Sequence, residues 1–218
     1  MTAVELKVPW MSRSDRRRWR SACTVADLGA LMALWLEGEL RSWPGYMPGC
    51  GPEDETTHLI PSLAALNRAG FLTIASQPGG AGTGYYDRWW EQRAGVEGFV
   101  SDRALYKRLL DAAEAAGLDV AVDDVQTGTY DPGIIVTTVD GEPFTEFGAR
   151  LSYRDMRTIW PVVSQEAFVS LTTAVRMAIV APERGTAGER MWPVLDFVTG
   201  LRRHDPDNPW NSEPARER

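Results

Sequence analysis

The chain has 218 residues, of which 44% are apolar and 24% charged, and its formal net charge is −7 at pH 7. These proportions are typical of globular proteins, and they exclude a disordered low-complexity chain and a surface that follows nucleic acid throughout. Cys23 and Cys50 lack the spacing of a disulfide framework or zinc site, and no apolar run reaches the about 20 residues that cross a bilayer. We therefore expect a cytoplasmic protein with no metal, no cofactor and no membrane partner.

Residues 1–22 are expected to form a basic N-terminal arm with a short helix. Beside a single acid, Asp15, the segment carries Arg13, Arg16, Arg17, Arg18 and Arg20. With Trp10 and Trp19 as stacking surfaces, the arm could bind a phosphate backbone. The negative total charge favours the alternative, in which the arm pairs with acidic surface of the same protein, so we do not expect nucleic acid as the main partner.

A helix is predicted after Thr24, because Thr24 and Asp27 have the spacing of a capping box. Apolar residues then repeat at helical intervals from Leu28 to Leu40. The helix should end before residues 43–52, which hold three prolines and three glycines and are expected to form a loop.

A second helix is predicted over residues 54–68, ending at Gly70 in the left-handed conformation. Pro61 either occupies the first turn of a short helix or kinks a longer one. Residues 71–75 are expected to form a strand. The glycines at 79–84 lack the spacing of a nucleotide-binding loop, so we expect a flexible loop from there to about residue 85.

The middle of the chain is expected to be rich in strands. Alternating apolar and polar residues predict a strand over 91–100, and Ser101 with Asp102 then caps a helix that Gly117 closes. Val120 and Val122 mark another strand.

The dipeptide Asp140-Gly141 indicates a hairpin between residues 134–139 and 142–147, because it supplies the positive φ angles of a type I′ turn. Pro143 places its strand at an edge or a bulge.

The last third is expected to return to helix from Ser164. Residues in helical register there are Phe168, Leu171, Val175 and Ala178. Thr186 and Glu189 form another capping box before a helix over 192–201, and the polar residues 204–218 are expected to form a disordered tail.

These elements predict an α+β fold with a single mixed β-sheet covered by helices and with helical N- and C-terminal thirds. Residues 23–203 would form one domain.

Polar residues on two predicted strands form the candidate site. Ser76 and Gln77 end one strand, and Gln92, Arg93 and Glu97 lie on the next. Arg93 and Glu97 are four apart and therefore share a strand face. Arg93 could hold a phosphate or carboxylate that Gln77 and Gln92 orient, with Glu97 as the general acid/base. The alternatives are a solvated strand face and a turn stabilised by Ser76.

The acidic run Glu53, Asp54 and Glu55 precedes a predicted helix, where carboxylates stabilise the positive helix end. Metal binding is the alternative, and it would require further oxygen ligands from elsewhere. His58 has no neighbouring serine or cysteine in a nucleophile motif, so we expect no catalytic triad.

Three segments carry a resemblance to a known family: Leu66–Thr73 (LNRAGFLT), Ser76–Gly79 (SQPG) and Gln92–Phe99 (QRAGVEGF). Together they resemble an uncharacterised actinobacterial, Streptomyces-type family whose related segments occur in chromosomes, plasmids and phage genomes. The resemblance implies no activity. It implies only that the family pattern includes Asn67, Arg68, Ser76, Gln77, Gln92 and Arg93.

We therefore expect a small anionic or nucleotide-like ligand to bind near Ser76, Gln77, Gln92, Arg93 and Asn67, and the pattern does not decide whether Glu97 performs chemistry. A second hypothesis is a protein-interaction module or inhibitor associated with a plasmid or phage, which would use some of the nine tryptophans as an interface. A third is DNA binding through the arginine-rich arm.

Overall fold

The protein is described by a computed structural model that covers residues 11–202. The first ten residues of the expected arm and the expected disordered tail at 204–218 lie outside the described residues. The α-helices are α1 Arg13–Ser21, α2 Val25–Leu36, α3 Ile60–Ala69, α4 Arg103–Ala115, α5 Tyr153–Ile159, α6 Gln165–Thr173 and α7 Met191–Thr199. The 3₁₀ helices are η1 Asp54–Leu59, η2 Tyr85–Asp87 and η3 Gly185–Arg190. The strands are β1 Phe71–Gln77, β2 Gly80–Thr83, β3 Trp89–Val100, β4 Asp119–Asp124, β5 Thr129–Tyr130, β6 Ile134–Val139, β7 Glu142–Phe147 and β8 Val175–Arg184.

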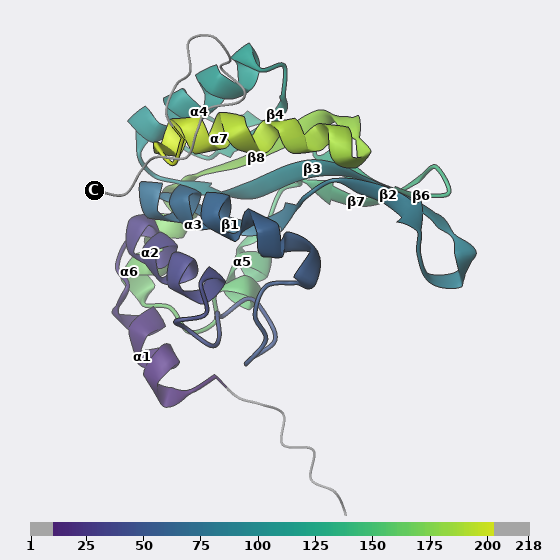
Figure 1. The fold of residues 1–218 in the computed structure, drawn as a ribbon. Coiled ribbons are helices and arrows are strands. Elements are labelled where there is room, and N and C mark those ends of the chain that lie inside the picture. The colour runs from purple at the N-terminus through teal and green to yellow at the C-terminus, as the bar shows by residue number, and fades with distance from the viewer. Residues whose placement is uncertain (1–10, 203–218) are drawn as a thin grey trace, which may run out of the picture.

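Strand β3 is the centre of a single sheet with the order β5-β4-β8-β3-β6-β7. Its C-terminal half pairs with β1 and β8, and its N-terminal half pairs with β2 and β6. The predicted α+β class, with one sheet covered by helices, is confirmed. The sheet was expected to be mixed, but all of the described strand pairs are antiparallel. The β2–β3 and β6–β7 hairpins project from the body as an arm (Figure 1).

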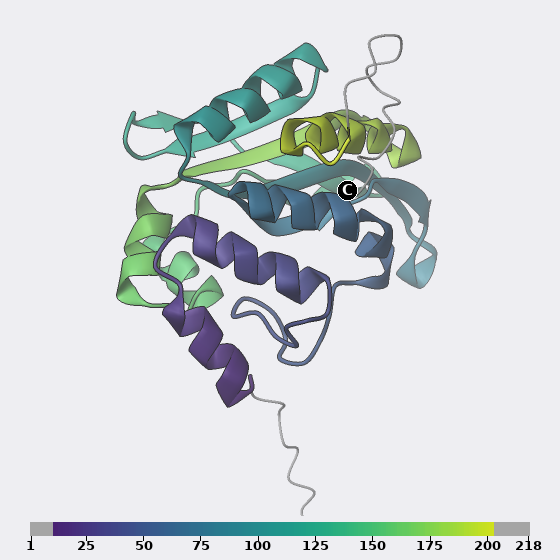
Figure 2. The ribbon, with the colours of Figure 1, turned by 60° about the vertical axis from the view of Figure 1, so that its left-hand side comes forward.

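Helices α4, α7, α3 and α2 lie side by side in that order, with neighbouring helices in contact (Figure 2). Helices α2 and α3 pack on β1, and α4 packs on β3 and β4. The buried apolar side chains between these helices and the sheet form the main core, whereas a smaller cluster around Val136, Phe147 and Val180 forms a second one.

One end of the main core is built from tryptophans. The rings of Trp19 and Trp160 lie 6.1 Å apart, and those of Trp43 and Trp160 lie 5.5 Å apart. Trp19 Nε1 donates a hydrogen bond to the carbonyl of Ser42 over 2.8 Å. Helix α1, which falls within the expected basic arm, therefore contributes a fully buried side chain to the core.

Local capping and turn signals gave correct element ends. The Thr24–Asp27 capping box has both of its hydrogen bonds, over 3.1 and 2.9 Å. Gly70 ends α3 with φ 103°, and the β6–β7 turn has positive φ at Asp140 (52°) and Gly141 (85°), as predicted. Among the strands of residues 11–202, β7, which contains Pro143, pairs with β6 alone and is therefore an edge strand.

The structure of residues 54–69 decides between the two alternatives for Pro61. Residues 54–59 form the 3₁₀ helix η1, and α3 begins at Ile60 with Pro61 in its first turn. A proline there costs little, because its missing N–H would have no partner within the helix.

Two predicted elements and one predicted cap were wrong. The expected loop over 79–85 contains β2, which pairs with the N-terminal half of β3. The helix that starts after Ser164 ends at Thr173, and Val175 begins the ten-residue strand β8, where a continued helix was expected. The capping box proposed for Thr186 and Glu189 does not form, since these residues lie in η3. The helix predicted over 192–201 is confirmed as α7.

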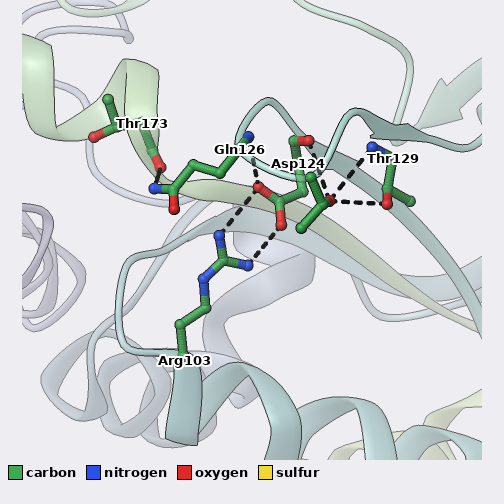
Figure 3. A network of polar contacts seen from close by, with 6 residues as sticks. Arg103, Asp124, Gln126, Thr129 and Thr173 are labelled. Carbon is green, nitrogen blue, oxygen red and sulfur yellow. Dashed lines mark hydrogen bonds and ion pairs between the residues drawn. The ribbon is translucent and has the colours of Figure 1, made fainter.

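A buried carboxylate ties the start of α4 to the end of β4 (Figure 3). Asp124 accepts two hydrogen bonds from the Arg103 guanidinium, over 2.6 and 3.1 Å, and one from the Gln126 backbone N–H over 3.0 Å. Gln126 in turn donates to the carbonyl of Thr173 at the end of α6, over 2.8 Å. The hydrogen bonds from Arg103 are the main cause that lowers the pKa of Asp124 to about 2.

We expect Asp124→Asn to lower the free energy of unfolding at pH 7 by about 1 to 2 kcal/mol. The loss is limited because solvent around the Arg103 guanidinium screens the ion pair. A lowered folded-state pKa stabilises the protein above the unfolded-state value of 3.8, and the stabilisation disappears as the pH falls through about 2. Urea unfolding at pH 7 and at pH 2 measures this. A difference between wild type and variant that is as large at pH 2 as at pH 7 would contradict the assignment.

Candidate functional site

Gln77, a predicted ligand-binding residue, connects three strands. Its side-chain Nε2 donates to the backbone carbonyls of Arg93 on β3 and Val136 on β6, over 2.7 and 3.0 Å. Its Oε1 accepts from the Thr137 hydroxyl over 3.2 Å. The amide is buried and its hydrogen-bonding groups are occupied within the sheet.

Arg93 and Glu97 have different charged partners. The Arg93 guanidinium forms an ion pair with Asp119 of β4 and donates from Nε to the carbonyl of Ala181 on β8, over 2.7 Å. The Glu97 carboxylate is buried, forms an ion pair with Arg176 of β8 over 2.6 Å and accepts from the Gly148 backbone N–H over 2.8 Å. The geometry therefore gives each group its own protein partner.

Asn67 is fully buried between α3 and β1. Its Nδ2 donates to the carbonyl of Leu63 and to the Thr73 hydroxyl, over 2.8 and 2.7 Å, and its Oδ1 accepts from the Thr73 backbone N–H over 3.0 Å. Gln92 is half-buried on β3, between Gly80 of β2 and Thr137 of β6. Among the described residues, neither Asn67 nor Gln92 makes a side-chain hydrogen bond to Arg93 or Glu97.

Ser76 differs from the other predicted residues because it lines a pocket. It is adjacent to Gln77 on β1 and therefore points to the opposite sheet face, toward α2. The pocket has a volume of about 160 Å³ and lies between α2, residues 43–56 and β1. Its volume is well below the about 300–1,000 Å³ of sites for drug-sized molecules, so it suits a small group.

The loop that covers this pocket is held by side-chain hydrogen bonds. Trp35 Nε1 donates to the carbonyl of Cys50 over 3.1 Å, and the Ser42 hydroxyl accepts from the Gly49 backbone N–H over 2.9 Å. The chain passes close over the Trp43 ring at Gly45, where an added Cβ would lie 2.2 Å from a ring carbon. The prolines and glycines of the predicted loop thus form a fixed wall.

Three aromatic rings line the pocket: Trp35, Trp43 and Tyr46. The ring planes of Trp35 and Trp43 meet at 60° with centroids 5.8 Å apart, and those of Trp35 and Tyr46 meet at 65° with centroids 6.1 Å apart. Both pairs are edge-to-face contacts, so the three rings contribute differently oriented planes to the pocket wall.

The polar side chains of the pocket are acidic or neutral. They are Glu53, Thr56, Thr73 and Ser76. The Glu53 carboxylate accepts a hydrogen bond from the Tyr46 hydroxyl and makes no capping bond to η1, although capping was the expected role of this acidic run. Among the described residues that line the pocket, none is basic.

The acidic run lies at the start of η1 and is exposed to solvent at Glu53, Asp54 and Glu55. Within residues 11–202, no three histidine, cysteine, aspartate or glutamate side chains are placed to hold a metal ion. The run therefore adds negative charge beside the pocket without forming a described metal site.

Ser76 was predicted as a site residue from the sequence, whereas Trp35, Trp43, Tyr46 and Glu53 were not. A signal was present, because aromatic residues flank a proline- and glycine-rich loop that an acidic run follows. Nothing in the sequence shows that the loop folds back onto β1, so these features could not be combined into one site.

The fold and the pocket define an α+β domain with a small aromatic-lined hollow beside its sheet. Residues 14–199 match the family described as a domain of unknown function (DUF6919), so the chain belongs to that family. This confirms the expected membership in an uncharacterised domain family. No curated protein matches the chain, and no helix within residues 11–202 is long and apolar enough to cross a membrane.

Proposed function

We propose that this domain binds a small organic molecule in the pocket lined by Trp35, Trp43, Tyr46 and Ser76. The observation that carries the proposal is a hollow walled by three aromatic rings, of which Trp35 meets the other two edge-to-face. Pockets of this composition, mostly apolar with a few polar groups, are typical of small-molecule sites.

The proposal moves the site away from Arg93. An anionic ligand was expected there, but the Arg93 guanidinium already pairs with Asp119 and donates to Ala181. An anion would have to displace these partners from a largely buried side chain. Ser76 is the predicted residue that the new proposal retains.

Filling the pocket tests the proposal. Ser76→Phe places a ring in the hollow, whereas Ser76→Ala removes only a hydroxyl and serves as the control. Three molecules of similar size are the probes: cationic choline, its neutral isostere 3,3-dimethylbutan-1-ol and anionic 3,3-dimethylbutanoate. In calorimetric titrations we expect at least one probe to bind wild type and Ser76→Ala, and to bind Ser76→Phe at least about tenfold more weakly.

The proposal fails if no probe binds wild type, or if Ser76→Phe binds the same probes as tightly as Ser76→Ala. Thermal unfolding of both variants establishes that each is folded at the temperature of the titration.

Protein interaction is a second candidate, favoured by the exposed aromatic side chains Tyr86, Trp89 and Phe144 on the projecting hairpins (Figure 1). Glu91 and Glu142 lie on the same projecting hairpins, so the partner would be a protein with a basic surface. Unchanged affinity of a purified partner for the Trp89→Ser variant would exclude this surface.

DNA binding through the arginine-rich segment retains less support. Trp19 is fully buried and is not available for stacking, whereas Arg13, Arg17 and Arg20 are exposed on α1. Affinity for DNA that is the same after these three arginines are replaced by glutamine would exclude this role.

A further inference from the structure

We infer that the ligand of the aromatic pocket is a small, free quaternary ammonium cation, with a trimethylammonium group like that of choline. This inference rests on the proposed function, because it assigns a ligand class to the same pocket. It follows from the ring geometry, the charge of the lining and the apolar side chains that line the pocket.

The rings provide the first argument. A cation is attracted to the negative face of an aromatic ring, and cages of several rings are the usual way in which proteins recognise quaternary ammonium groups. Trp35 lies at 60° to Trp43 and at 65° to Tyr46, which is the arrangement of walls around a roughly spherical group. The volume of about 160 Å³ limits the ligand to such a group with a short chain.

The charge provides the second argument. Glu53 lines the pocket, its carboxylate is bonded to Tyr46, and the exposed Asp54 and Glu55 follow it in the chain. Since none of the described lining residues is basic, the field at the pocket favours a cation and opposes an anion.

The apolar part of the lining distinguishes a quaternary from a primary ammonium. Beside the three rings, the pocket is lined by Leu36, Leu63 and Ile74, whose side chains cannot accept a hydrogen bond but can contact methyl groups. A primary ammonium has three N–H donors that would each need an acceptor on burial, whereas a trimethylammonium group has none. The pocket therefore favours the methylated cation.

The test compares choline with its neutral isostere 3,3-dimethylbutan-1-ol and with ethanolamine, its primary-amine counterpart. We expect choline to bind wild-type protein at least about tenfold more tightly than either. Glu53→Gln should weaken choline binding about five- to tenfold and leave binding of the neutral alcohol unchanged. Glu55→Gln is the matched control, because Glu55 is exposed in the same run but does not line the pocket, and it should change choline affinity less than about twofold.

Two substitutions of Tyr46 provide an independent test of the ligand class. Tyr46→Leu removes a ring from a half-buried position and should weaken choline binding about tenfold, whereas Tyr46→Phe keeps the ring and should retain most of the affinity. Phosphatidylcholine vesicles separate a lipid head group from a free cation, and we expect no co-sedimentation. Co-sedimentation that free choline abolishes would overturn the assignment to a free molecule.

The inference is overturned if the neutral alcohol binds as tightly as choline, or if Glu53→Gln and Glu55→Gln affect choline binding equally. In either case, binding that Ser76→Phe abolishes would leave the proposed function intact. Absence of binding by all probes would instead remove the proposed function.

Discussion

Replacing Glu97 by alanine is expected to lower the free energy of unfolding by about 3 to 5 kcal/mol, because it leaves a buried arginine without its counter-charge. The Glu97 carboxylate lies 2.6 Å from Arg176 Nη2, and both side chains are buried. In the described structure Nε and Nη1 of Arg176 have no other partner, and the Gly148 N–H would also lose its acceptor. Urea unfolding followed by circular dichroism measures the loss.

Two further variants show whether the loss comes from the ion pair. Glu142→Ala removes an exposed carboxylate from β7 and should change stability by less than about 0.5 kcal/mol. The double substitution Glu97→Leu/Arg176→Met removes both charges, and it should be more stable than Glu97→Ala alone. A loss below about 1 kcal/mol for Glu97→Ala would contradict a structural role for Glu97 and reopen its predicted role as an acid/base.

Gly98→Ala is expected to lower the free energy of unfolding by about 3 kcal/mol or more, because the added Cβ has no space between β3 and β1. The added carbon would lie 2.1 Å from the carbonyl oxygen of Leu72 and 2.9 Å from the Cα of Thr73. Both atoms are backbone, at a point where the β1 register shifts between Thr73 and Ala75, so no side-chain rotation relieves the clash.

Gly82→Ala is the matched control for this position. Gly82 also lies in a strand paired with β3, but nothing lies within 4 Å of an added Cβ. We expect its midpoint of thermal unfolding to equal that of wild type or to rise slightly. A Gly98→Ala protein that unfolds at the wild-type temperature would show that β1 and β3 do not approach as described.

The parts of the fold that could be predicted from the sequence are those fixed by neighbouring residues. The capping box at Thr24 and Asp27 and the turn at Asp140 and Gly141 require only atoms a few positions apart. Their chemistry determines the local conformation whatever the rest of the chain does.

The missed strands depend on partners that are distant in the sequence. Residues 175–181 of β8 are buried throughout, and such a continuous apolar run has no alternation that separates a strand from a buried helix. Strand β2 consists of Gly80, Ala81, Gly82 and Thr83, mostly residues of low strand preference, and it forms because β3 extends far enough to pair with it.

The predicted site residues were chosen by chemical type, but the sequence does not show which partner each one meets. Arg93 pairs with a residue 26 positions away, and Glu97 pairs with one 79 positions away. The pocket also depends on contacts between distant segments, since it forms where α2 and residues 43–56 fold against Ser76 of β1. Candidate residues can be read from a sequence, whereas their convergence depends on the tertiary fold.

The central claim is that the pocket between α2 and β1 is the binding site, and indole N–H resonances test it most directly. The tightest-binding of choline, 3,3-dimethylbutan-1-ol and 3,3-dimethylbutanoate would be titrated into ¹⁵N-labelled protein, with the indole signals assigned from Trp→Phe variants. We expect saturable shifts of the Trp35 and Trp43 signals, while the signal of Trp90 on the projecting hairpins stays in place. Saturable shifts of Trp90 with unmoved Trp35 and Trp43 signals would place the site elsewhere and contradict the claim.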